Sequence, residues 1–81
     1  MASPTITTFV LGDDQTNCFV IRVGDADTCW IIDCGFDPDQ MLDWIAEHSL
    51  TPSGILLTHC HSDHIAGIDR ALSRFGSMPI W

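Results

Sequence analysis

The sequence predicts an α/β fold in which a mixed β-sheet carries helices on one face. Segments rich in β-branched and aromatic residues fill the first 33 positions, and short polar turns separate them. From Asp37 onward the apolar residues recur at helical spacing, and a short apolar strand and a second helical segment follow. Hairpins followed by strand–helix–strand crossovers are typical of such a sheet.

The N-terminal part of the chain is expected to form strands joined by tight turns. Gly and Asp are concentrated between the apolar segments, as is typical of hairpin loops. The last of these segments is continuously apolar at its centre, which favours a strand buried on both faces. The predicted strands cover residues 5–11, 17–23 and 28–33.

A helix is expected next, with Asp37 as its N-cap and Pro38 as its first residue. Gln40 lies three residues after the cap and completes a capping pattern. Residues 51–54 should break the helix, which is expected to run to about residue 48. The apolar stripe of this helix consists of Met41, Leu42, Ile45 and Ala46.

The remaining residues are expected to form a strand, a helix and the start of another strand. Residues 54–58 are an apolar run of the kind found in parallel sheets. A second helix should extend to about residue 75, where Gly76 ends it, and Met78 should begin the last strand. The apolar face of this helix consists of Ile65, Ile68, Leu72 and Phe75.

The composition limits the domain organisation and the partners. A chain of 81 residues forms one small domain at most, and 46% apolar against 17% charged residues suits part of a larger core. The net charge is −8, from eleven acidic residues against three Arg and no Lys. Because nucleic acids and anionic membranes attract clusters of Lys and Arg, we expect neither as a partner.

The N-terminal residues and the cysteines indicate the compartment. The start of the chain lacks the basic and apolar regions of a signal peptide, and no apolar run approaches the roughly 20 residues of a membrane span. We therefore expect a cytoplasmic location. In that compartment Cys18, Cys29 and Cys34 are expected to be small buried residues.

A cluster of metal-binding residue types follows the predicted strand at 54–58. Strand-to-helix loops of this kind lie at the carboxyl end of a sheet, where the ligand sites of α/β folds collect. In an extended segment His59 and His61 point the same way and could chelate one ion, while Asp63 and His64 could face a second. These ligand types suit zinc, and also iron or manganese.

A bound ion at this loop would lower the pKa of coordinated water towards about 7 and create hydroxide at neutral pH. The alternative is a His-rich surface loop that binds metal only adventitiously. Cys60 lies inside the cluster and is expected to be either a thiol beside the metal or a small buried side chain.

Residues 58–67, Thr-His-Cys-His-Ser-Asp-His-Ile-Ala-Gly, closely resemble the HxHxDH signature of the metallo-β-lactamase superfamily. Residues 31–35, Ile-Ile-Asp-Cys-Gly, resemble the short strand of that family that ends in Asp and Gly. Residues 15–21 are similar to the early Thr-Asn-Cys strand of its glyoxalase II-like, or hydroxyacylglutathione hydrolase-like, branch. The resemblance covers residues 6–81 in the family's order.

The resemblance implies a role for each matching residue. His59 and His61 match the ligands of the first metal, and Asp63 and His64 match those of the second. In members that use one metal, the residue that matches Asp63 instead orients the attacking water or accepts a proton. Asp33 matches an acidic residue that supports the histidine loop through hydrogen bonds. A turn-forming residue at the strand end is an equally weighted alternative for Asp33.

The resemblance also implies an αβ/βα sandwich of two similar halves, of which residues 1–81 are the N-terminal half. The third His of the first metal, the acidic residue that bridges the metals and the last His of the second metal are missing. The C-terminal half would be needed to complete the site, since catalytic zinc sites use three protein ligands. The truncated domain alone is expected to be inactive, and its uncovered inner face should favour association.

The function that this resemblance implies is a metal-dependent hydrolase acting on a small-molecule thioester or ester through a metal-bound hydroxide. Glyoxalase II-like thioesterase activity is the first hypothesis, and a lactonase or β-lactamase is also possible. Within the same fold, a mononuclear-iron sulfur dioxygenase is an alternative that would use the same histidines. The competing class is a non-catalytic metal-binding half-domain that must assemble with another chain.

Overall fold

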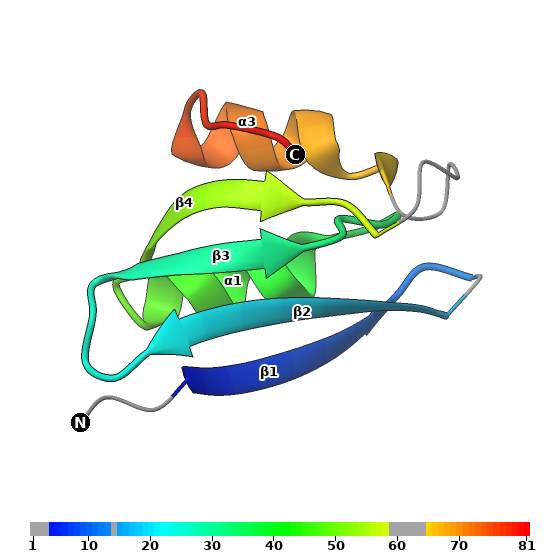
Figure 1. Cartoon of the computed structure of the whole chain (residues 1–81). Coiled ribbons are helices and arrows are strands. Elements are labelled where there is room, and N and C mark those ends of the chain that lie inside the picture. Colours follow the sequence, from blue (N-terminus) through cyan, green and yellow to red (C-terminus); the bar gives the residue numbers. More distant parts are fainter. Residues whose placement is uncertain (1–3, 14, 59–64) are drawn as a thin grey trace.

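The computed structural model of the protein describes residues 4–13, 15–58 and 65–81. These residues form a four-stranded sheet with helices packed on it (Figure 1). In chain order the elements are β1 (Pro4–Leu11), β2 (Thr16–Val23), β3 (Thr28–Ile32), α1 (Asp39–Glu47), β4 (Thr51–Leu56) and α3 (Ile68–Phe75).

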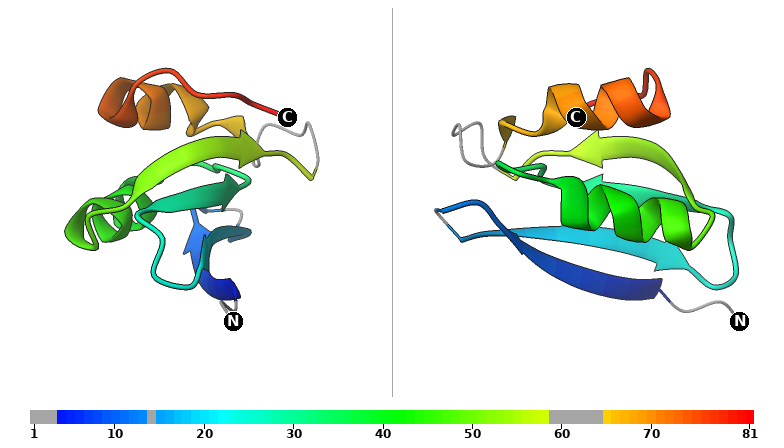
Figure 2. Two further views of the ribbon diagram at one scale, coloured as in Figure 1. Left: turned by 60° about the vertical axis from the view of Figure 1, so that its left-hand side comes forward. Right: turned by 180° about the vertical axis from the view of Figure 1, so that it is seen from behind.

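The sheet has the order β1-β2-β3-β4 and is mixed. The strands β1, β2 and β3 form an antiparallel meander, and β4 runs parallel to β3 after the crossover through α1. Figure 2 shows α1 and α3 on the same side of the sheet. The predicted α/β architecture, a mixed sheet with helices on one face, is therefore confirmed.

The core lies between the sheet and the two helices. Alternate residues of each strand point toward the helices, which is the two-residue period of an extended chain. The rings of Phe9 and Trp44 meet edge-on with 5.8 Å between centroids and join β1 to α1. The buried apolar residues of the strands are Phe9, Leu11, Cys18, Val20, Cys29, Ile31 and Ile55, and those of the helices are Met41, Leu42, Ile45 and Ala71.

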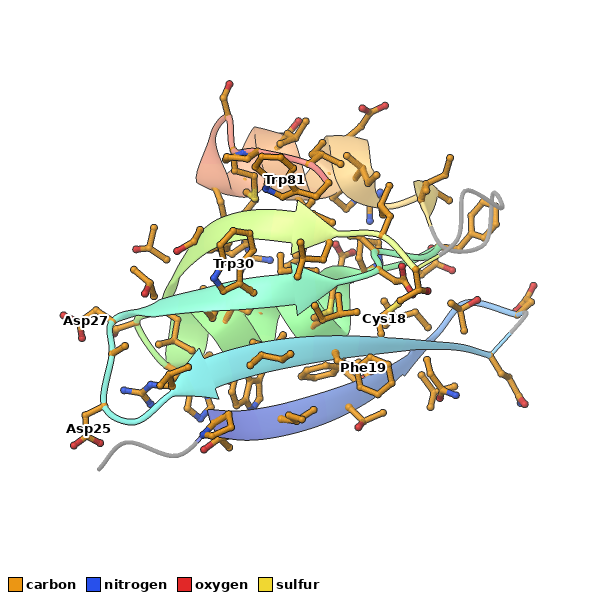
Figure 3. All side chains as sticks on the ribbon, viewed as in Figure 1. Cys18, Phe19, Asp25, Asp27, Trp30 and Trp81 are labelled. Atoms are coloured by element: carbon orange, nitrogen blue, oxygen red, sulfur yellow. The ribbon has the colours of Figure 1, made fainter. Side chains whose placement is uncertain are left out.

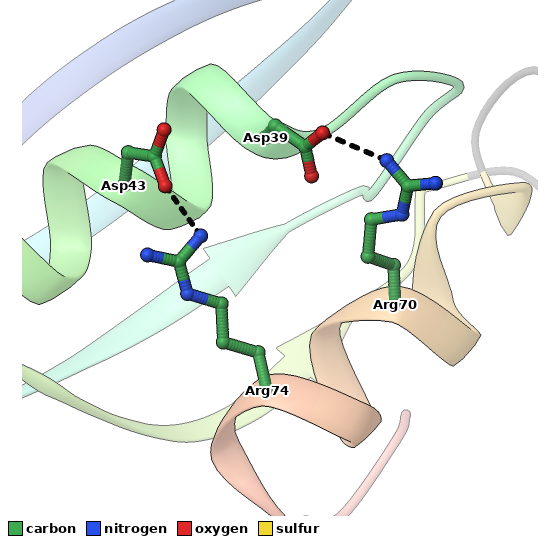
Figure 4. Close-up of polar contacts among 4 residues, drawn as sticks. All are labelled: Asp39, Asp43, Arg70 and Arg74. Atoms are coloured by element: carbon green, nitrogen blue, oxygen red, sulfur yellow. Dashed lines mark hydrogen bonds and ion pairs between the residues drawn. The ribbon is translucent and has the colours of Figure 1, made fainter.

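The helices α1 and α3 are joined by two ion pairs (Figure 4). Arg70 donates a hydrogen bond to the Asp39 carboxylate at 2.8 Å, and Arg74 donates one to Asp43. The two aspartates are four residues apart on α1 and the two arginines are four residues apart on α3. Residues at this spacing share one side of a helix, so the two charged sides face each other. Exposed pairs of this kind contribute little stability, about 0–1 kcal/mol each. Among the described residues, no helix is long and apolar enough to cross a membrane.

The first helix begins later than the sequence pattern indicates. Pro38 is the N-cap residue, no side chain caps the helix, and the helix starts at Asp39. The prediction of Asp37 as N-cap is wrong: the first helical hydrogen bond runs from the Leu42 amide to the Pro38 carbonyl oxygen, and Asp37, with a φ of 52°, belongs to the turn before the helix. Ala46 is exposed, so only part of the predicted apolar stripe faces the core.

The strand before the histidine motif is also placed differently. It begins at Thr51 rather than at residue 54 and ends at Leu56 rather than at residue 58. Pro52 is accepted in it because the ladder between β3 and β4 is irregular at Cys29 and Trp30, just beyond the pairing of Pro52. The predicted start of a last strand is found one residue later, because residues 79–81 pair in parallel with β4 around Ile80 and Ile55.

Three cysteines are buried, as predicted. Cys18, Cys29 and Cys34 each have an exposed fraction of 1% or less. Burial raises the pKa of the Cys34 thiol to about 12, and the neighbouring Cys18 adds to the increase. Burial also raises the pKa of Cys29 to about 11, although the charge of Arg22 acts in the opposite direction. The fold therefore holds both thiols in the neutral form.

We expect this burial to make the protein less stable in alkali. Below pH 9 both thiols are neutral in the folded and unfolded states, so the folded state loses nothing there. Above pH 9 the unfolded chain releases these protons while the folded chain retains them, so stability falls as the pH rises towards 11–12. The chain has no Tyr and no Lys, whose side chains would also titrate between pH 9 and 12, so the change in stability in this range is assigned to the cysteines. Urea unfolding across this range measures the effect.

The matched control for the alkaline experiment is the Cys34→Ala variant. It lowers stability at every pH through the lost side chain, but it should also flatten the pH dependence above pH 9. A wild-type unfolding midpoint that stays constant between pH 9 and 11 would contradict the prediction.

Candidate metal centre

The predicted metal-binding loop follows β4 at one edge of the sheet. Because β3 and β4 are parallel neighbours, their carboxyl ends meet at this edge, and the segments after both strands lie side by side there (Figure 1). The candidate ligands His59, His61, Asp63 and His64, and also Cys60, lie outside the described residues. Their assignment as metal ligands therefore stays a prediction, whereas the residues on both sides of the loop can be described.

Asp33 anchors the amino-terminal side of the loop. It lies one residue after β3, is 1% exposed and has a φ of 62°, a backbone conformation that Asp tolerates better than most residues. Its amide donates a hydrogen bond to the Leu56 carbonyl oxygen at 2.8 Å, which joins the ends of β3 and β4. Asp33 thus has the turn-forming geometry that was one of its two expected roles.

The Asp33 carboxylate also binds the residue directly before the loop. Its Oδ1 accepts a hydrogen bond from the Thr58 amide at 2.8 Å, and its Oδ2 accepts one from the Thr58 hydroxyl at 2.6 Å. Hydrogen bonds to a charged group contribute about 1.5–3 kcal/mol each when they are shielded from water. Sequence reasoning assigned no separate role to Thr58. The available signal was a hydroxyl residue between the apolar strand and the first histidine.

Gly67 anchors the carboxyl-terminal side of the loop. Its amide donates a hydrogen bond to the Cys34 carbonyl oxygen at 2.8 Å, and its own carbonyl accepts the amide of Ala71 to begin α3. A Cβ at this position would overlap the Gly35 carbonyl oxygen and lie 2.8 Å from Cγ of Pro38. The φ of Gly67 is −94°, so the position needs glycine for space rather than for backbone freedom.

Both ends of the candidate loop are therefore fixed to one short segment, residues 33–38. Asp33 holds Thr58 on the entry side, and Cys34, Gly35 and Pro38 surround Gly67 on the exit side. Contacts of this kind, made by the residues on either side of a ligand loop, are how supporting residues orient metal ligands.

The donor set fits a metal ion in chemical type. Imidazole and carboxylate side chains suit zinc, iron and manganese, and the loop supplies three histidines and one aspartate. Within 4–13, 15–58 and 65–81, no three His, Cys, Asp or Glu side chains form such a group. Both carboxylate oxygens of Asp33 accept hydrogen bonds from Thr58, as expected of a residue that supports the loop.

The fold and the anchored residues define the class of protein: an α/β domain in which the candidate metal-binding residues follow, in sequence, a strand that ends at the carboxyl edge of the sheet. The family model described as the metallo-beta-lactamase superfamily matches residues 11–80. This chain belongs to the metallo-β-lactamase superfamily, as its motifs indicated.

The curated relatives include hydroxyacylglutathione hydrolases. That of Pectobacterium carotovorum is 34% identical over 67 residues, which are 83% of this chain and 26% of the relative. The hydroxyacylglutathione hydrolase of Salmonella paratyphi B is 36% identical over 67 residues, which are again 83% of this chain and 26% of the relative. The chain thus spans about a quarter of the length of these relatives.

Solved structures share the fold. The BLEG-1 B3 metallo-beta-lactamase matches with a TM-score of 0.85 and 37% identity, over 94% of this chain and 35% of that one. The DIM-1 metallo-beta-lactamase matches with a TM-score of 0.60 and 20% identity, over 95% of this chain and 37% of that one, which supports the fold alone.

Proposed function

We propose that residues 59–64 bind one or two divalent metal ions, with zinc as the first candidate, in a hydrolase that acts on a small-molecule thioester. The observation that carries the proposal is the pair of anchors on either side of the loop, Asp33 on Thr58 and Cys34 on Gly67. A surface loop that binds metal only adventitiously has no need of a buried carboxylate at its entry.

The residues of this chain would divide the work in the following way. His59 and His61 would hold one ion, His64 and Asp63 a second, and Asp33 would keep the loop in position through Thr58. In a site with a single ion, Asp63 would instead accept a proton from the attacking water. When bound, the ion would polarise the substrate carbonyl and acidify water.

The names of the relatives support a thioester as the substrate class. Hydroxyacylglutathione hydrolases match 83% of this chain at 34–36% identity. The BLEG-1 B3 metallo-beta-lactamase matches at 37% identity, so hydrolysis of a lactam ring is the second candidate. The matched part is 26–35% of those proteins, so the substrate contacts made by their remaining parts would have to come from outside these 81 residues.

The metal proposal can be tested without activity. We expect the purified chain to bind zinc weakly, because two ligands per ion are fewer than the three of a catalytic site. The His61→Ala variant should weaken zinc binding about tenfold or more, as measured by competition with a chromophoric chelator. His48→Ala is the matched control, because His48 caps α1 and stacks on Trp44, away from the loop.

The proposed site would be contradicted if His61→Ala bound zinc as tightly as the wild type. It would also be contradicted if His61→Ala and His48→Ala lost the same amount of zinc affinity. Selective retention of iron instead of zinc would favour the sulfur dioxygenase alternative. Thioester hydrolysis can be assayed with an acyl-glutathione. The 81 residues alone should be inactive, and cleavage should require the missing ligands.

A further inference from the structure

The two ion pairs between α1 and α3 lie on the helical side of the sheet. Figure 3 shows Phe19 and Trp30 in front of the sheet, while α1 lies behind it. In the sandwich of two halves that the family resemblance implies, the front would face the other half and the two helices would face solvent. The four charged side chains of the pairs are 36–60% exposed. The contacts between the helices can therefore be interpreted from the described residues alone.

Helix α3 is held less firmly by burial than α1 is. Ala71 is its one fully buried residue, whereas α1 has three. Ile68 and Phe75 are only partly buried where they pack against the core. No side chain caps the amino end of α3. The position of this helix must therefore depend on individual contacts as well as on the apolar core.

Two of these contacts join the same short segments at the amino ends of both helices. Gly67 packs against Pro38, because a Cβ at the glycine would lie 2.8 Å from Cγ of the proline. Three residues later Arg70 donates its hydrogen bond to Asp39, which directly follows Pro38 (Figure 4). A single contact leaves a helix free to swing about it, whereas two contacts between the same segments also fix its direction.

The second ion pair lies one helical turn farther from the candidate metal loop. At a rise of about 1.5 Å per residue, Arg70 is about 4.5 Å along the helix from Gly67, and Arg74 is about 10 Å along it. Without the Arg70 contact, α3 would stay tied to α1 at Arg74, and its amino end could swing about that point. Without the Arg74 contact, the carboxyl end would swing and Gly67 would stay in place.

We propose that Arg70 and Asp39 are positioning residues for the candidate metal loop, a role that rests on the proposed function. Gly67 lies three residues after His64, so a displacement at the start of α3 would reach the proposed ligands of the second ion. Ligand sites must be held within roughly 0.5 Å of their working geometry. Exposed ion pairs contribute little to stability, so this pair acts on the direction of α3 rather than on whether the chain folds.

Zinc competition with a chromophoric chelator on the full 81-residue chain tests the proposal. We expect Arg70→Gln and Asp39→Asn each to weaken zinc binding about three- to fivefold, the range that an exposed ion pair can supply. The two substitutions change the net charge in opposite directions. A general effect of charge on zinc would therefore strengthen binding in one variant and weaken it in the other. The double variant should bind no more weakly than either single variant.

The matched controls are Arg74→Gln and Asp43→Asn. They make the same changes of charge in the ion pair that lies farther from the loop. Their zinc affinities should stay within about twofold of the wild type. Urea unfolding of all four single variants should give nearly the same midpoint, because the proposed effect is on position and not on stability.

Hydrogen exchange gives a measurement that needs no metal. The Gly67 amide donates a hydrogen bond to the Cys34 carbonyl oxygen, and this bond holds the start of α3. Its proton should exchange about three- to fivefold faster in Arg70→Gln than in Arg74→Gln, because the swing of the amino end opens this bond more often. Equal exchange in the two variants would overturn the proposal.

The zinc measurements can overturn the proposal in two further ways. Equal zinc affinities in Arg70→Gln and Arg74→Gln would do so while leaving the proposed function intact. Opposite changes in Arg70→Gln and Asp39→Asn would also do so, since they would indicate an effect of charge alone. The proposed function is tested separately by His61→Ala. If that variant binds zinc as the wild type does, the proposed function fails, and the exchange of the Gly67 proton still decides whether Arg70 positions the start of α3.

Discussion

Replacement of Asp33 by alanine is expected to lower the free energy of unfolding by about 3 kcal/mol. The variant loses the two hydrogen bonds to Thr58 and leaves the Thr58 amide without that acceptor. Alanine also adopts the positive φ of this position less readily than aspartate does. Because a chain of this size has only a few kcal/mol of stability, Asp33→Ala should be close to unfolded at room temperature.

Two further variants separate the contributions of Asp33. Asp33→Asn keeps the side-chain shape and a residue that tolerates positive φ, so it isolates the loss of the negative charge. Its destabilisation should be smaller than that of Asp33→Ala and measurable even if the alanine variant does not fold. Combining it with Thr58→Val in a double-mutant cycle gives the coupling between the two residues directly.

Urea unfolding is the measurement for Asp33, and Asp25→Ala is the control. Asp25 is an exposed aspartate in the turn between β2 and β3, and its replacement should change stability by less than about 0.5 kcal/mol. If Asp33→Ala costs no more than Asp25→Ala, the carboxylate does not anchor the loop. If the Asp33 and Thr58 variants prove additive, the two residues act independently.

Most of the fold could be predicted from the sequence because its signals are local. The hairpin strands have β-branched residues and polar turns, and β1, β2 and β3 are found within one residue of their predicted positions. The boundaries that were wrong depend on long-range contacts. The turn that contains Asp37 at positive φ joins β3 to α1, and Pro52 lies in a strand at the point where the ladder between β3 and β4 is irregular.

The candidate site was predictable as a list of residues but not as an arrangement. The spacing of His59, His61, Asp63 and His64 indicates a metal-binding loop, and the superfamily match agrees with that class. The resemblance implied that Asp33 supports the loop through hydrogen bonds, but nothing in the local pattern identifies Thr58, 25 positions away, as the donor of both. These hydrogen bonds follow from the parallel pairing of β3 and β4, which brings the ends of both strands together.

Replacement of Gly67 by alanine is expected to destabilise the protein by about 2–3 kcal/mol, although alanine is the better helix former. The new methyl group would overlap the Gly35 carbonyl oxygen and lie 3.1 Å from Sγ of Cys34. A backbone carbonyl cannot rotate away as a flexible side chain can. The start of α3 must therefore move off the segment 33–38, which weakens the bond from the Gly67 amide to the Cys34 carbonyl.

The same displacement should reach the candidate metal loop, because Gly67 lies three residues after His64. We expect Gly67→Ala to bind zinc more weakly than the wild type even under conditions in which the variant is fully folded. Ser73→Ala is the control, since Ser73 is an exposed residue of the same helix whose replacement removes a surface hydroxyl. Urea unfolding and zinc competition on the two variants give the comparison.

A Gly67→Ala variant as stable as Ser73→Ala would show that α3 can move without cost. Unchanged zinc affinity together with reduced stability would limit the role of Gly67 to packing.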